Sequence, residues 1–156
     1  MKQPDGSYTT KDELFIEAPP EEIYKLLIDF NHRHLWWKTN RATLLNGKEV
    51  QEGSRVAISG RPWIFPIHFL MRVRKLETAR LIRLEAEEGP IRGICEWQIE
   101  PKGKGALVRL SWNGVRPKGI AAKFLFAVVG DRKHSQHAAL GLAGLKAYLD
   151  KGPCAT

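Results

Sequence analysis

Cysteine is scarce in this sequence: Cys95 and Cys154 are the only two among 156 residues. They do not form a disulfide framework, and such sparse use is typical of a reducing compartment. Long apolar runs are missing as well, since none approaches the roughly 20 residues that a membrane span needs. The longest, at 120–130, is interrupted by Lys123. The first 15 residues lack the apolar stretch of a signal peptide, so we expect a soluble, cytoplasmic protein.

Several catalytic and cofactor motifs are also missing. The sequence contains no Gly-x-Ser-x-Gly elbow, no phosphate-binding loop with a lysine and no dinucleotide fingerprint, so we expect no cofactor. The histidine pairs His32/His34 and His134/His137 lack accompanying Cys or carboxylate residues at zinc-site spacing, so we expect no metal.

Acidic residues are outnumbered by basic ones. The 25 Lys and Arg against 17 Asp and Glu give a formal net charge of +8. This excess would suit an anionic partner, although the simpler explanation is a solvated basic surface. The basic residues are spread along the chain without a dense run, so we do not expect nucleic acid binding. Contact with a membrane surface, without spanning, stays open, and nothing indicates an oligomeric state.

The sequence is long and apolar enough for one folded unit. With 43% hydrophobic residues, 156 residues are the length of a single domain with its own core. We therefore predict one domain over 1–156, with flexible tails at 1–9 and 151–156.

The first 37 residues predict a strand and two short helices. Apolar and charged residues alternate at 11–18, as in a half-buried strand. Pro19 and Pro20 then favour a helix start, where no backbone N–H donor is needed. Apolar residues at helical spacing follow as far as Phe30, and HRHLWW (32–37) indicates a second short helix or turn.

The remaining sequence predicts a meander of strands and a long helix. Alternating runs separated by Gly and Pro turns occur at 41–45, 53–59, 65–74, 82–87, 93–100 and 106–113. A helical pattern covers about 120–148, and Gly152-Pro153 end it. The predicted fold is α+β: a curved antiparallel sheet of about seven strands wrapped round a long C-terminal helix, with two short helices after the first strand.

Such a sheet with one helix across it is a place where an apolar cavity is expected. The inward strand positions are the candidate lining, although each could equally be ordinary core. They are Phe69, Met71, Cys95, Trp97, Leu110 and Trp112.

One stripe of the predicted long helix includes polar residues. Phe124, Val128, Asp131 and Ser135 lie along it, and His134 follows Asp131 at i+3. Asp131 and His134 are therefore candidates for an acid/base or ligand-binding pair. The alternative is that this part of the helix passes the edge of the sheet and meets solvent.

Two segments carry a resemblance to a known family. FIEAPPEEIYKLLIDF (15–30) with LWW (35–37), and HAALGLAGLKAYLDKG (137–152), resemble the SRPBCC superfamily, also called START-like or birch-pollen-allergen-like proteins, and within it the polyketide cyclase/dehydrase and lipid-transport branch. The resemblance implies a helix-grip fold in which the two short helices support the long one. It places Trp36 and Trp37 near the cavity entrance, although both could instead fill the core.

The predicted function is binding of a hydrophobic or aromatic small molecule, lipid- or polyketide-like, in the internal cavity. The first alternative is a cofactor-independent cyclase or dehydratase that uses Asp131 and His134. The second is binding of an anionic surface through the basic excess.

Overall fold

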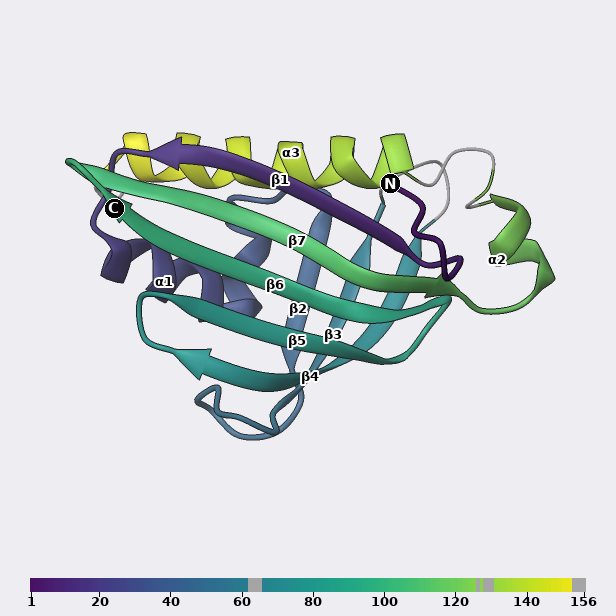
Figure 1. Ribbon diagram of the computed structural model, residues 1–156. Helices are drawn as coiled ribbons and strands as arrows, with labels where there is room; N and C mark the ends of the chain where they lie inside the picture. Colours follow the sequence, from purple (N-terminus) through teal and green to yellow (C-terminus); the bar gives the residue numbers. More distant parts are fainter. Residues whose placement is uncertain (62–65, 126, 128–130, 153–156) are drawn as a thin grey trace.

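The chain builds one curved antiparallel sheet with helices on its concave side (Figure 1). A computed structural model describes residues 1–61, 66–125, 127 and 131–152. The elements are β1 (Tyr8–Ile16), α1 (Pro20–Ile28), the 3₁₀ helix η1 (Phe30–Leu35), β2 (Asn40–Leu44), β3 (Arg55–Gly60), β4 (Ile67–Glu77), β5 (Leu81–Glu88), β6 (Ile91–Lys102), β7 (Gly105–Pro117), α2 (Ile120–Leu125) and α3 (Asp131–Asp150). The sheet order is β1-β7-β6-β5-β4-β3-β2, so the predicted seven-stranded helix-grip fold is confirmed.

Helix α1 begins as the sequence predicts. Pro19 is its N-cap and Pro20 its first residue, and two glutamates in the first turn face the positive end of the helix dipole. Ile23 and Leu27 are fully buried on its inner side. After Asp29 the chain continues into η1, whose Phe30 and Arg33 are both buried.

Strand alternation divides the sheet into an apolar concave face and a charged convex face. In β5, for example, Ile82, Leu84 and Ala86 are buried, whereas the residues between them are partly exposed. The same alternation in β4, β6 and β7 places Met71, Trp97 and others in one continuous core with α1, η1 and α3. The core therefore lies between the sheet and its helices, where a cavity can form.

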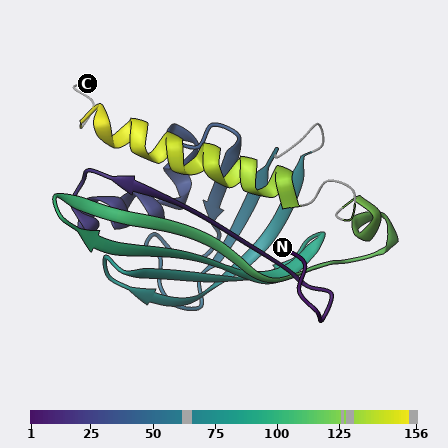
Figure 2. The same ribbon diagram turned by 45° about the horizontal axis from the view of Figure 1, so that its top comes forward.

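The predicted single helix over 120–148 is wrong. Among the described residues of this range, α2 and α3 are separate helices, and Figures 1 and 2 show that they lie apart and point in different directions. On α2, Ile120 and Phe124 are 90% and 73% exposed, so these two side chains are not part of the core. Helical periodicity describes residues along one axis, and it cannot tell one long helix from two on different axes.

Helix α3 lies across the concave side of the sheet, next to β1 (Figure 2). Its 20 residues span about 30 Å. Gly141 and Gly144 let it approach the Trp pair closely: a Cβ at Gly141 would lie 2.6 Å from the Trp37 ring, and one at Gly144 1.9 Å from the Trp36 carbonyl oxygen. No helix of the described residues combines the length and the apolar character that crossing a membrane requires.

The N-terminal residues lie against the sheet. Strand β1 begins at Tyr8, inside the segment that we expected to be a flexible tail. The N-terminal amino group donates to the Thr9 carbonyl at 2.6 Å, and Asp5 pairs with Arg116 of β7 at 2.8 Å. Within the predicted C-terminal tail, 153–156 lie outside the described residues.

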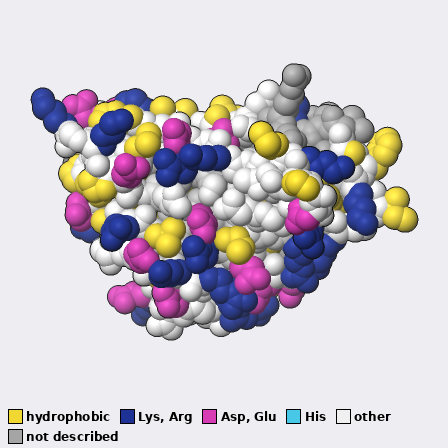
Figure 3. Space-filling model, in the orientation of Figure 1, with side chains coloured by type: hydrophobic (Ala, Val, Ile, Leu, Met, Phe, Trp, Pro, Cys, Tyr) yellow, Lys and Arg dark blue, Asp and Glu magenta, His cyan; other side chains and the backbone are white. Residues whose placement is uncertain are grey.

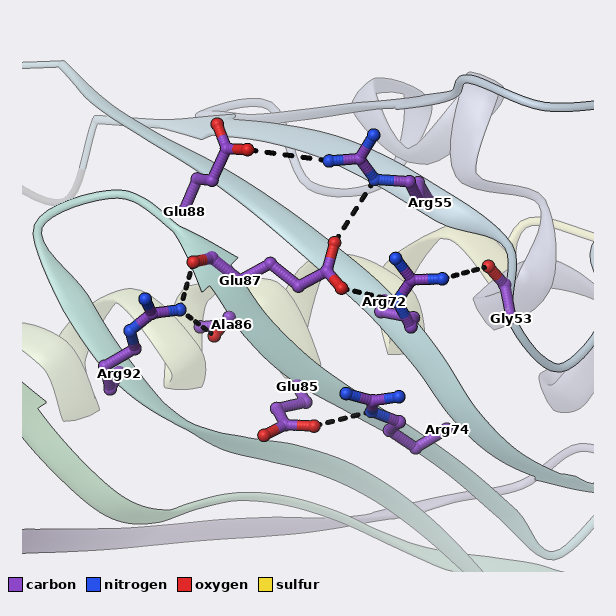
Figure 4. Close-up of polar contacts among 9 residues, drawn as sticks. All are labelled: Gly53, Arg55, Arg72, Arg74, Glu85, Ala86, Glu87, Glu88 and Arg92. Carbon is purple, nitrogen blue, oxygen red and sulfur yellow. Dashed lines mark hydrogen bonds and ion pairs between the residues drawn. The ribbon is translucent and has the colours of Figure 1, made fainter.

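Arginine and glutamate side chains pair across strands on the convex face (Figure 4). Glu87 of β5 accepts from Arg55 of β3 at 3.2 Å and from Arg72 of β4. Arg74 donates to Glu85 at 2.5 Å. Basic and acidic groups are accordingly interspersed on the face in Figure 3, with no large region of one sign.

Candidate functional site

An interior cavity of about 70 Å³ lies between the sheet, η1 and α3. This is about half the volume of an engineered cavity of about 150 Å³ that binds benzene, and it is large enough for a few water molecules. Its wall is made by Arg33, Trp37, Asn40, Ile58, Gly60, Ile67, Phe69, Met71, Leu84, Cys95, Trp97, Leu110, Trp112, His137 and Ala138. In this conformation the cavity suits a small compound and has no room for a lipid chain.

All six strand residues that the sequence predicts as lining do line this cavity. The pairing of β6 with β7 brings them together, because Cys95 lies opposite Trp112 and Trp97 opposite Leu110. Phe69 of β4 contacts the Trp112 ring at a centroid distance of 6.2 Å. Their role in binding a ligand stays a prediction.

Three tryptophans form a cluster at the end of the cavity near η1. The Trp36 and Trp37 rings stack at 5.9 Å, and each meets the edge of Trp97 at 6.1 Å. Trp37 lines the cavity. Trp36 is 4% exposed and is not part of the cavity wall, whereas both Trp36 and Trp37 border an outer groove beside Tyr148.

Arg33 is a buried cation in the cavity wall. It is 3% exposed, and its guanidinium lies over the rings of Phe30 and Trp36, with Cζ 4.8 and 6.0 Å from their centroids. Nη2 donates to the Leu27 carbonyl at 3.4 Å, while Nε has no hydrogen-bond partner. Burial lowers the pKa of Arg33 to about 10, which leaves it charged at neutral pH. No carboxylate in the described ranges forms an ion pair with it.

Other polar groups meet at the same end of the cavity. Trp37 Nε1 is a buried donor without an acceptor, and Asn40 Oδ1 is a buried acceptor without a donor. The His137 ring lies on Trp37 at 4.8 Å, and its Nδ1 is 3.4 Å from Thr39 Oγ1. Burial lowers the pKa of His137 to about 4, so its imidazole is neutral at pH 7.

Cys95 faces the same space. Burial raises the pKa of its thiol to about 12, so it is protonated at neutral pH. Among the described residues, no group of three His, Cys, Asp or Glu side chains is placed to hold a metal ion.

Of the residues predicted on the C-terminal helix, Ser135 and Phe124 are described, and neither lines the cavity. Ser135 donates to Asp12 of β1 at 2.5 Å, and Phe124 is exposed on α2. Val128 and the side chains of Asp131 and His134 lie outside what the structure describes.

Sequence reasoning missed Arg33 and Asn40, and considered His137 only as a metal ligand. One signal was present for Arg33, which lies three residues after Phe30 and three before Trp36, on the side of a helical turn that holds large rings. His137 is next to Ala138, which begins the row of buried residues on α3 that continues with Leu142 and Leu145. Asn40 had no sequence signal.

A curved sheet closed by a helix around an interior cavity defines the helix-grip class. The family model described as polyketide cyclase / dehydrase and lipid transport matches residues 9–150, and the chain belongs to this family. A search of curated proteins by sequence found no match.

Solved structures with the same fold come from bacteria and plants. The Thermus thermophilus protein TTHA0849 is 18% identical with a TM-score of 0.80, covering 94% of this chain and 100% of its own. A START superfamily protein from Mycobacterium smegmatis is 16% identical, with a TM-score of 0.72 and coverage of 90% and 98%. Major latex-like protein 151 from Panax ginseng is 12% identical, with a TM-score of 0.74 and coverage of 91% and 97%. At these identities the likeness concerns the fold.

Proposed function

We propose that this protein binds a small hydrophobic or aromatic molecule in the cavity between the sheet and α3. The observation that carries the proposal is the cavity wall itself, in which Trp37, Phe69, Trp97 and Trp112 surround a space that also contains unpaired polar groups. Flat rings give large contact areas, and a few polar groups set orientation, as in most small-molecule sites. Membership of a lipid-transport and polyketide cyclase family supports this reading.

Native mass spectrometry of the purified protein, compared with the same sample denatured, tests the proposal. We expect extra mass that disappears on denaturation. Ala138 lines the cavity, whereas Ala139 is exposed on the same helix, so they offer a matched pair of variants. Ala138→Leu should fill the space and remove the extra mass, and Ala139→Leu should retain it. A bare wild-type protein that no small aromatic compound stabilises against heat would contradict the proposal.

A cyclase- or dehydratase-type reaction is the second candidate, and His137 is the observation that favours it. Its imidazole lines the cavity and is unprotonated at pH 7, although a pKa of about 4 makes it a weaker base than an ordinary histidine. The predicted pair Asp131 and His134 remains a proposal for the same reaction. Incubation of the protein with aromatic polyketide precursors, followed by mass spectrometry for loss of water, distinguishes the two. If the wild-type protein converts a precursor and His137→Gln does not, the result favours the enzyme. If the wild-type protein leaves every precursor unchanged, the result favours the binding protein.

A further inference from the structure

The positive charge of Arg33 is poorly balanced inside the protein. A buried cation is normally paired with a carboxylate, because removing it from water is costly. Arg33 has one long hydrogen bond to a carbonyl and two aromatic rings near it, all of them neutral partners. Its Nε–H group is buried with nothing to accept it. The protein thus holds a cation at the cavity wall without supplying the anion.

A second donor in the same wall is also unused. Trp37 Nε1 is buried without an acceptor and lines the same cavity as Arg33. The third unpaired atom, Asn40 Oδ1, is an acceptor and would suit a hydroxyl group. Buried polar groups normally have hydrogen-bond partners, so these three atoms indicate which polar groups a ligand of this cavity would carry. Two hydrogen-bond donors, one of them positively charged, match an oxyanion, because an oxyanion accepts hydrogen bonds and is negatively charged.

The size of the cavity limits the rest of that molecule. About 70 Å³ between aromatic and aliphatic side chains is too small for an extended chain. A cavity that binds benzene measures about 150 Å³, so a single flat ring requires the side chains of the wall to move apart. We infer that the ligand is a small aromatic monoanion whose carboxylate, or an equivalent oxyanion, pairs with Arg33 and accepts from Trp37. This inference rests on the proposed function and specifies the ligand class of the same cavity.

Benzoate and benzamide are suitable probes because they share size and shape and differ in charge. Dissociation constants for wild-type protein come from quenching of tryptophan fluorescence and from ligand-observed NMR. We expect benzoate to bind at least roughly tenfold more tightly, which is the effect of one charged hydrogen bond. This comparison needs no mutation, so it decides the question even if a variant does not fold.

Arg33→Met keeps the unbranched apolar stem of the side chain and removes the guanidinium group with its charge. We expect benzoate affinity to fall to that of benzamide, and benzamide affinity to change less than about twofold. Arg41→Met is the matched control, because Arg41 is exposed on β2 and lies outside the cavity wall. It removes the same charge from the molecule and should leave both affinities unchanged.

Three outcomes would overturn the inference, and they differ in whether the proposed binding function still stands. Benzamide binding as tightly as benzoate would remove the anion and keep the binding function. If Arg33→Met still prefers benzoate but melts at a lower temperature, Arg33 has only a structural role, in which it donates to a carbonyl at the end of α1. No binding of either probe would remove the inference together with a one-ring ligand for the cavity.

Discussion

At the scale of single residues, burial changes the chemistry of two cavity side chains, Cys95 and His137. Burial is the largest cause of both pKa shifts, and at Cys95 it outweighs the nearby Arg33 charge, which lowers the pKa. The interior therefore keeps the thiol and the imidazole neutral at pH 7. Arg33 is the one charged side chain in the described cavity wall.

His137 makes stability depend on pH. Its folded pKa of about 4 lies below the unfolded value of 6.5, so the unfolded chain binds more protons between these values. The stabilisation is complete above pH 6.5 and decreases as pH falls toward 4. Because His137 keeps some exposure, we expect a loss of about 1–2 kcal/mol between about pH 7.5 and pH 5. Urea unfolding of wild type and His137→Gln at both pH values measures it, and equal losses in the two proteins would contradict it.

Cys95 should react slowly with thiol reagents. A thiol pKa raised from 9.0 to about 12 lowers the thiolate fraction about a thousandfold, and the cavity also limits access. In a Cys154→Ser variant, where Cys95 is the only thiol, we expect iodoacetamide to react at least about 100-fold more slowly with folded than with urea-unfolded protein. Comparable rates would show that the cavity is open to solvent.

At the scale of elements, α3 packs closely against Trp36 and Trp37, which directly follow η1. Gly141 and Gly144 lower the intrinsic stability of the helix, by about 1 kcal/mol each relative to alanine. They are present because the Trp37 ring and the Trp36 carbonyl occupy the space of a side chain. This approach positions His137 and Ala138 over the concave face, where they line the cavity.

Gly144→Ala should therefore destabilise the protein despite the better helix propensity of alanine. A Cβ 1.9 Å from the Trp36 carbonyl oxygen forces the helix and η1 apart, and overpacking of this kind costs about 1–3 kcal/mol. Chemical denaturation gives the change in free energy of unfolding. Ala143→Gly, at an exposed position of the same helix, is the control and should cost about 1 kcal/mol. A stabilised Gly144→Ala protein would mean that α3 does not pack so closely.

At the scale of the whole molecule, the formal charge of +8 does not form one basic patch on the face shown in Figure 3. Arg55, Arg72 and Arg74 on the convex face already have carboxylate partners. Exposed pairs of this kind stabilise a protein only weakly, yet they cancel local potential.

Binding to phosphatidylserine vesicles tests this view. We expect little sedimentation with vesicles at about 150 mM salt, where charges more than about 8 Å apart are screened. Glu85→Gln combined with Glu87→Gln frees the paired arginines, so this variant should bind more at low salt. Strong wild-type binding that salt does not weaken would contradict the view and favour a membrane-surface function.

The sequence by itself determined the element order, the seven strands and the inward positions of Phe69, Met71 and Trp97, because alternation and turn residues are local properties. It also predicted the start of α1 from Pro20. It did not separate α2 from α3, because periodicity holds no information on the direction of an axis. Arg33, Asn40 and His137 meet only in the folded chain, from η1, β2 and α3. Only the tertiary structure decided that an arginine flanked by histidines is buried, because burial depends on which distant elements pack over a residue.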